Sequence, residues 1–323
     1  MRRNCHQGYD FANFTPLCAI WVRVGRAEHH RTMRPVFLGT EALARGDLTR
    51  GQLRWNYRSI YRDVYIPRNA SRSLRDNTVA AWLWSGRRGV VTGRAAAAWH
   101  GAEWVDQFAP VELIGRIDHP PPGIIVRRER FGSDEVVQRD GLPVTTAART
   151  AFDLARHLPR GTAVTHLDAL ARATGITTQD VAPLAAHYRG ARGVRRCRTA
   201  LSLMDAGSQS PKETWLRLVL IDAGLPVPRT QIKVTDGRTA AFVDMGYDEP
   251  RVGVEYDGDH HRTDRSQYVH DIGRAEMLER MGWIVVRVIA EHSPRFIIHR
   301  VRQAFARRGY SPAVPPIRLH TGL

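Results

Sequence analysis

Lysine is nearly missing from this chain of 323 residues, in which Lys212 and Lys233 are the only two. Cysteine is almost as scarce, and Cys5, Cys18 and Cys197 are too widely scattered to form a CxxC pair. This usage supports neither a disulfide framework nor a cysteine-based zinc site. We therefore expect a protein of the reducing cytoplasm.

Long hydrophobic runs are missing as well. The apolar run 16–22 is far too short to span a bilayer, and Arg23 and Arg26 follow it where an export signal would have a cleavage site. We expect no membrane partner and no export signal. Residues 1–33 show little periodicity, which predicts a disordered extension or an over-long start.

Positive charge, by contrast, is abundant. The chain carries 48 lysine and arginine residues against 32 aspartate and glutamate residues, a formal net charge of +16. Such a balance favours a polyanionic partner, although a high arginine content can also reflect genome composition. The length exceeds what one hydrophobic core usually supports, so we expect a mixed α/β (α+β) protein of several domains.

Residues 34–70 have the order of a winged helix. Apolar residues recur at helical spacing from Phe37, Thr49 and Gln52 form a capping box that opens a second helix, and the segment 59–67 is aromatic and β-branched like a strand pair. The segments 46–53 and 62–65 resemble the N-terminal winged-helix domain of AbiEi-type antitoxins.

Arginines recur every fourth residue in this segment. Arg50, Arg54 and Arg58 would line one face of a helix, as a groove-reading element requires. The alternative is a small module that binds a protein partner and never touches DNA.

Residues 71–160 predict a small α/β module, with strands at 110–114 and 123–127, and they resemble the core that follows the winged helix in AbiEi-like proteins. We find no catalytic constellation in this module. Arg149 and Asp153 are expected to form a salt bridge on a helix surface. Residues 161–207 predict a helical connector.

Residues 208–308 predict a further domain, followed by a tail at 309–323. A capped helix from Ser210 is followed by strand patterns near 231–244 and 251–257, a helix at 266–281 and a strand at 283–288. The resulting order is αβββαβ. It matches the core of restriction-endonuclease-like proteins.

Acidic side chains gather on the second of these strand patterns. Because side chains alternate along a strand, Glu255 and Asp257 share one face, and like charges there repel unless something binds them. Hard oxygen ligands with room for water suit Mg²⁺ or Mn²⁺.

Five spaced motifs carry a resemblance to a known family. In order, they are Glu213, Asp244, Glu255-Tyr-Asp257-Gly-x-x-His261, Asp271-x-x-Arg274 and Gly282-Trp-x-Val-x-Arg287. Together they resemble the nucleases related to very-short-patch-repair (Vsr) endonucleases, which have the PD-(D/E)XK fold. The resemblance implies a Mg²⁺-dependent phosphodiesterase that acts on DNA.

The resemblance also implies roles for residues. Asp244 and Glu255 would hold the metal, Glu213 a metal-bound water or a second ion, and His261 would be a general acid or base. Asp257 stands where the wider fold usually has lysine. Either His261 and an arginine replace that lysine, or the site has lost catalysis and kept a DNA-binding surface.

We therefore expect a metal-dependent DNA endonuclease, with a DNA-binding regulator of the antitoxin type as the alternative and an RNA nuclease or RNA-binding component as a third class. The oligomeric state and the preferred DNA stay open. The residues expected to contact nucleic acid are Arg50, Arg54, Arg217, Arg262, Arg274 and Arg287.

Overall fold

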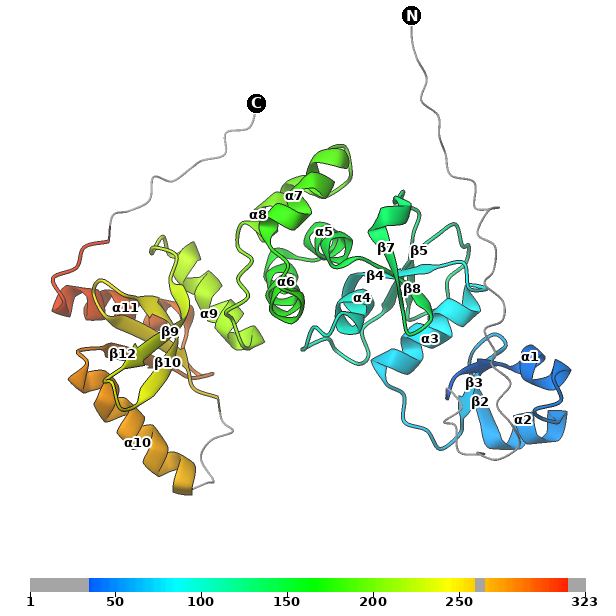
Figure 1. Ribbon diagram of the computed structural model, residues 1–323, viewed down its shortest axis with the longest axis horizontal. Coiled ribbons are helices and arrows are strands. Elements are labelled where there is room, and N and C mark those ends of the chain that lie inside the picture. Colours follow the sequence, from blue (N-terminus) through cyan, green and yellow to red (C-terminus); the bar gives the residue numbers. More distant parts are fainter. Residues whose placement is uncertain (1–34, 259–264, 313–323) are drawn as a thin grey trace, which may run out of the picture. The chain divides into compact units, whose positions relative to one another are not determined.

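A computed structural model describes residues 35–258 and 265–312. Within these ranges the protein is a mixed α/β chain with eleven α-helices and three separate sheets (Figure 1). The expected fold class, a multidomain α/β protein, is confirmed.

The first sheet follows the order expected of a winged helix. Thr49 caps α2 in a capping box with Gln52, and Asp63, with a φ of 62°, forms the turn between two antiparallel strands. One expectation is wrong: Arg58 is not on the helix, because α2 ends at Asn56. The sheet has the order β1-β3-β2, and its elements are β1 (Phe37–Leu38), α1 (Gly39–Ala44), α2 (Arg50–Asn56), β2 (Tyr57–Tyr61) and β3 (Val64–Pro67).

The second sheet has five strands in the order β6-β5-β4-β8-β7 and includes both strands expected in this segment. Val64 and Ile66 of β3 share a core with Ala80 and Leu83 of α3, so this helix packs on the first sheet as well as on the second. The elements are α3 (Leu74–Trp84), β4 (Val90–Thr92), α4 (Gly93–Trp99), β5 (Val111–Ile114), β6 (Ile124–Arg127), β7 (Val136–Arg139) and β8 (Leu142–Thr145).

A helical segment follows the second sheet. Its buried core contains Phe152, Leu167 and Cys197, and it also takes in Leu218 from the next part of the chain. In α8, the last helix of this segment, arginine occupies several of the exposed positions. The helices are α5 (Ala147–His157), α6 (Arg160–Thr174), α7 (Thr178–His187) and α8 (Val194–Leu201).

The third sheet has the predicted αβββαβ order. Strands β9, β10 and β11 form an antiparallel meander, and β12 pairs with β11 in parallel. Helix α10 covers one face, and α9 and α11 cover the other (Figure 1). The elements are α9 (Pro211–Asp222), β9 (Arg229–Thr235), β10 (Ala240–Tyr247), β11 (Val252–Tyr256), α10 (Arg265–Arg280), β12 (Ile284–Val288) and α11 (Pro294–Arg307).

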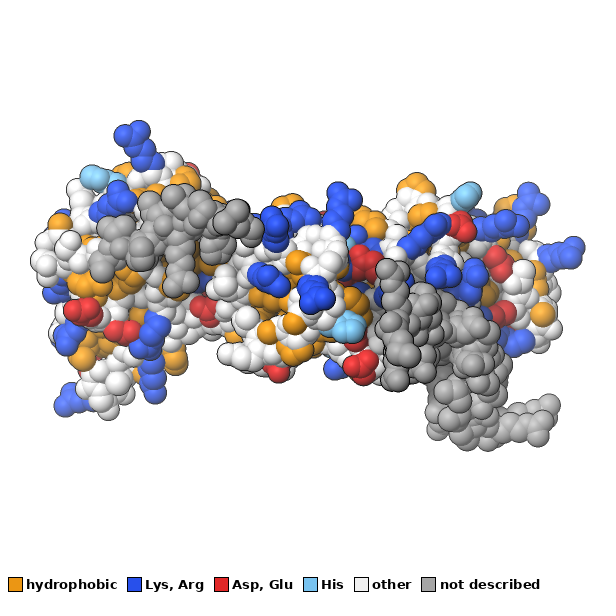
Figure 2. All heavy atoms as spheres, turned by 90° about the horizontal axis from the view of Figure 1, so that it is seen from above, with side chains coloured by type: hydrophobic (Ala, Val, Ile, Leu, Met, Phe, Trp, Pro, Cys, Tyr) orange, Lys and Arg blue, Asp and Glu red, His pale blue; other side chains and the backbone are white. Residues whose placement is uncertain are grey.

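The surface is rich in arginine. Lysine and arginine side chains are spread over the face drawn in Figure 2, among hydrophobic and acidic ones. Within the described ranges, no helix is both long and apolar enough to cross a membrane.

Candidate functional site

Two of the predicted carboxylates lie side by side on the third sheet. The antiparallel register that pairs Met245 with Val254 places Asp244 opposite Glu255. The backbone N–H of Tyr256 donates to Oδ2 of Asp244 at 3.0 Å, which fixes the carboxylate against the neighbouring strand. Strand pairing therefore brings together two acidic groups that stand 11 positions apart in the sequence.

Glu213 reaches the same place from the first turn of α9. Ser210 caps this helix and Pro211 is its first residue, so Glu213 lies in the first helical turn. Glu213 is 8% exposed, and its Oε2 accepts a hydrogen bond from the N–H of Gln209 at 2.8 Å. Burial raises the pKa of Glu213.

The three carboxylates influence one another electrostatically. Burial is the largest cause that raises the pKa of Asp244, and the negative charges of Glu213 and Glu255 act in the same direction, so that the pKa reaches about 7. The hydrogen bond from Tyr256 and the charge of Arg274 act in the opposite direction. A partly buried carboxylate of this kind holds a proton near neutral pH unless a cation replaces it.

A guanidinium already occupies part of this charge cluster. Arg274 of α10 donates to both oxygens of Glu255, at 3.1 Å from Nη1 and at a shorter distance from Nη2, and it donates to the carbonyl oxygen of Phe242 at 2.6 Å. Glu255 is therefore neutralised by a fixed positive charge. A metal ion bound to Glu255 would compete with Arg274 for the same oxygens.

The remaining predicted site residues of this domain lie in different places. Asp257 is exposed beyond β11, and its N–H donates to the carbonyl oxygen of Val288 at 2.7 Å. Arg287 is exposed on β12 in register with Glu255. His261 and Arg262 lie outside the described residues.

A groove opens beside Glu255. Its volume is about 600 Å³, and Glu255 and Arg287 line it together with Trp283, Arg307 and Arg308. Arginine is thus the commonest charged residue of the groove.

The placement of Arg217 does not fit the contact with nucleic acid expected from the sequence. Its side chain is 1% exposed, and its Nη2 pairs with Oδ2 of Asp168 at 2.7 Å. Its Nη1 donates to the carbonyl oxygen of Leu203. A guanidinium held in this way cannot reach a phosphate. The prediction that Arg217 contacts nucleic acid is therefore wrong.

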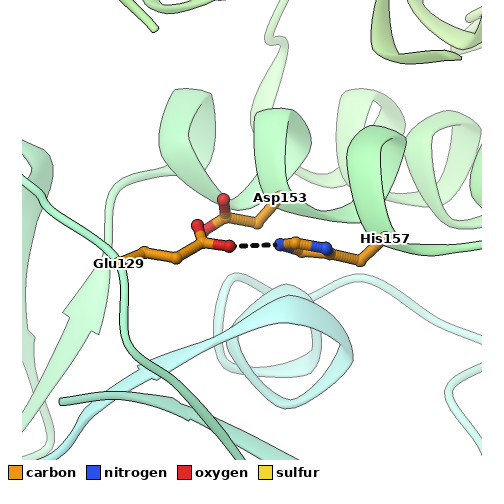
Figure 3. Close-up of side chains that lie close together, drawn as sticks. All are labelled: Glu129, Asp153 and His157. Carbon is orange, nitrogen blue, oxygen red and sulfur yellow. Dashed lines mark ion pairs between the residues drawn. The ribbon is translucent and has the colours of Figure 1, made fainter. Parts of the chain in front are cut away.

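Among the described residues, a single set of three or more His, Cys, Asp or Glu side chains brings its ligand atoms within 4.8 Å of one another. It consists of Glu129, Asp153 and His157 on and near α5, where Nε2 of His157 lies 3.0 Å from Oε1 of Glu129 (Figure 3). The carboxylates of the third sheet do not form such a set. The sequence reasoning missed this cluster.

Arginines, however, hold the carboxylates of that cluster. Nε of Arg149 lies 3.0 Å from Oδ2 of Asp153, and Nη2 of Arg156 lies 2.9 Å from Oδ1. Arg156 also contacts Glu129. Since cations already occupy these oxygens, the cluster fits a structural ion-pair network better than a metal site.

This network corrects a further expectation. Arg149 and Asp153 are each 1% exposed, so their salt bridge is buried and does not lie on a helix surface. Burial acts to raise the pKa of Glu129, but contact with His157 and the charge of Arg156 outweigh it and lower that pKa to about 2. The helical spacing of the arginines was readable in the sequence, whereas the approach of Glu129 from another segment was not.

The exposed arginines of α2 form a second candidate surface. Arg50 and Arg54 are both exposed one helical turn apart, and Arg62 is exposed at the turn between β2 and β3. Arg58 lies instead on β2 and donates to the carbonyl oxygen of Ala70 at 3.0 Å. The basic surface of the first sheet is therefore formed by α2 and the hairpin turn.

Two curated relatives match part of the chain. Both are from Mycobacterium tuberculosis, "Uncharacterized protein MT2308" from strain CDC 1551 / Oshkosh and "Uncharacterized protein Rv2248" from strain ATCC 25618 / H37Rv. Each is 30% identical over 173 residues, which cover 53% of this chain and 63% of the relative. The chain therefore matches less than two thirds of their length.

The second sheet and the helical segment match a known domain family. The match covers the chain from the start of β4 to just beyond α8, which contains the buried network of Arg149, Asp153 and Arg156. Residues 90–203 match the family model of the AbiEi antitoxin C-terminal domain.

Proposed function

We propose that this protein is a DNA-binding regulator of the antitoxin type. The observation that carries the proposal is the match of residues 90–203 to the AbiEi antitoxin C-terminal domain. In the chain this segment follows two short helices, of which α2 has a capping box, and a β-hairpin. A DNA-reading module joined to an antitoxin domain is an arrangement suited to a regulator that acts on DNA in the cytoplasm.

In this proposal α2 and the hairpin turn hold the DNA. Arg50, Arg54 and Arg62 are exposed and have no ion pair with any residue in the described ranges. Arginines placed on a short helix and on the adjacent hairpin can neutralise phosphates on both sides of a groove. The alternative use of this surface is to bind a protein partner.

The test is fluorescence anisotropy with a duplex from the upstream region of the protein's own gene and a scrambled duplex of equal length. Arg50→Ala and Arg54→Ala are each expected to weaken binding and to lower the slope of log affinity against log salt by roughly 1. Arg238→Ala, on the exposed turn between β9 and β10, is the matched control. Equal binding by the wild type and both α2 variants would contradict the proposal.

A metal-dependent DNA endonuclease is the second candidate function, and a specific observation favours it. Burial, together with the negative charges of Glu213 and Glu255, raises the pKa of Asp244 to about 7. If Mg²⁺ or Mn²⁺ binds, Asp244 and Glu255 would hold it with help from Glu213, and it would activate water against a phosphodiester. Arg287 stands in register with Glu255 and could neutralise the phosphate.

This second candidate is tested by nicking of supercoiled plasmid with Mg²⁺ or Mn²⁺. Asp244→Ala and Glu255→Ala are expected to lose at least 100-fold in rate, whereas Asp248→Ala, on the exposed turn between β10 and β11, keeps the wild-type rate. RNA offered in parallel separates the RNA nuclease class. If the wild type cleaves no faster than the two site variants on any substrate, the regulator is left as the sole function.

A further inference from the structure

Trp55 is unusually exposed for its size. Its side chain is 73% exposed at the last turn of α2, while Leu53, two residues earlier, takes the buried position of this helix. Burying an indole is strongly favourable, so a tryptophan left in water is a feature to be explained.

The helix end that carries Trp55 is held in place. The guanidinium of Arg68 donates to three backbone carbonyl oxygens at this end, those of Arg54 at 3.0 Å, Trp55 at 3.2 Å and Tyr57 at 3.3 Å. These bonds satisfy carbonyl groups that a helix end leaves without partners. The exposed ring therefore projects from an ordered base and can bind with little loss of conformational entropy.

The charges around the ring are positive. The guanidinium of Arg54 lies 5.7 Å from the centroid of the Trp55 ring, and Arg50 is exposed one turn earlier on the same helix. The acidic groups of this part of the chain are engaged in other contacts. Asp47 pairs with Arg45, Asp63 accepts from Thr40, and Glu41 pairs with Arg87.

An exposed aromatic ring beside an arginine fits a nucleobase better than a protein surface. A base offers a π-face for stacking, and the phosphates attached to it pair with the arginines. In continuous duplex DNA, however, neighbouring bases cover these faces, and the grooves expose only base edges. A rigid ring on a helix can therefore stack on a base only where that base is unpaired or displaced.

We propose that Trp55 stacks on an unpaired base, and that the nucleic acid bound by this protein contains at least one such nucleotide. The inference rests on the proposed binding of DNA by α2 and adds the kind of DNA that is bound. The arginines hold the phosphates on either side, and Trp55 selects for the exposed base.

The test is anisotropy with three DNAs of equal sequence: a duplex, the same duplex with one bulged thymine, and the single strand. The wild type is expected to bind the bulged duplex or the single strand on the order of tenfold more tightly than the duplex. Trp55→Ala abolishes this preference, and Trp55→Phe retains most of it. Since stacking releases no counterions, Trp55→Ala leaves the salt slope unchanged, whereas Arg54→Ala lowers it.

The outcomes separate this inference from the function on which it rests. If the wild type binds none of the three DNAs, the DNA-binding function itself fails. If it binds all three and Trp55→Ala changes nothing, or weakens binding to all three by the same factor, the stacking proposal is overturned and the ring is left to a protein partner. Thermal unfolding of Trp55→Ala at the wild-type temperature verifies that the loss does not reflect misfolding.

Discussion

Burial and the neighbouring charges determine the pKa of Asp244. The side chain is part of a cluster with Glu213 and Glu255, and among the residues that the structure describes, Arg274 provides the positive charge that lowers its pKa. A carboxylate of this kind is a cost to the folded state at neutral pH, because folding removes water from a charge and places other negative charges beside it. Clusters that destabilise the fold in this way are common at functional sites.

Asp244→Asn is therefore expected to stabilise the protein at pH 8 by about 2 kcal/mol. The folded protein binds the Asp244 proton more tightly than the unfolded chain does, with a pKa of about 7 against an ordinary value near 4. Wild-type stability thus falls as the pH rises through this window, and the advantage of asparagine disappears below about pH 4. Urea denaturation between pH 4 and pH 8 measures the difference.

Asp248→Asn is the matched control for this measurement. Asp248 lies on the exposed turn of the same hairpin, where it pairs with Arg229. Its replacement is expected to change stability little at any pH. A gain at pH 8 from Asp244→Asn that persists unchanged at pH 4 would show that the charge of Asp244 is not its cause.

At the scale of elements, two ion pairs join α6 to α9, and they differ in burial. Asp168 and Arg217 form a pair with almost no exposure, while Arg160 and Asp222 form a pair that is 40% and 55% exposed. Thr214 also donates to Asp168 at 2.8 Å. Burial raises the pKa of Asp168 to about 6 even though Arg217 is beside it, so the ion pair offsets only part of the desolvation.

Asp168→Ala is expected to destabilise the protein by about 3–5 kcal/mol, because it leaves a buried guanidinium without its counter-charge. Asp222→Ala, which breaks the exposed pair between the same two helices, is expected to cost less than about 1 kcal/mol. Denaturant unfolding of the two variants at pH 8 compares them directly. Equal losses in the two variants would mean that burial does not determine the strength of this junction.

At the scale of the whole molecule, α9 belongs to two cores. Leu216 and Leu220 pack with the third sheet, whereas Leu218 packs with the helical segment. Arg217 enters the same junction through Asp168. The predicted domain boundary before residue 208 therefore falls where side chains from both sides are buried together.

A fragment of residues 208–308 is expected to unfold at a lower temperature than the same elements do in the full chain. Cutting at this boundary exposes Leu218 and removes the partner of the buried Arg217. Circular dichroism melts of the fragment and of the full chain measure the effect. A fragment that melts as late as the full chain would establish residues 208–308 as an independent domain.

Much of the fold could be predicted from local patterns. The capping box at Thr49, the cap at Ser210 and the strand patterns gave the αβββαβ order correctly, because these signals depend on near neighbours in the chain. The end of α2 was placed too late, and Arg58 was assigned to the wrong element for that reason. Helix ends depend on tertiary contacts such as the one that Arg58 makes with Ala70.

The candidate site was predictable only in part. The spacing of Asp244 and Glu255 on consecutive strands was sufficient to place them together, because an antiparallel hairpin determines its own register. The hydrogen bonds from Arg274 to Glu255 and the ion pair of Arg217 with Asp168 were not predictable, since each joins residues far apart in the sequence.

By itself, the sequence determined the secondary-structure order, the strong positive charge and the acidic residues of the third sheet. Only the tertiary structure decided which charges are free and which are engaged: Arg50 and Arg54 remain exposed, whereas Arg149 and Arg217 are enclosed in ion pairs. The physical reason is that the burial of a charge depends on what packs over it, and that packing comes from segments that no local pattern connects.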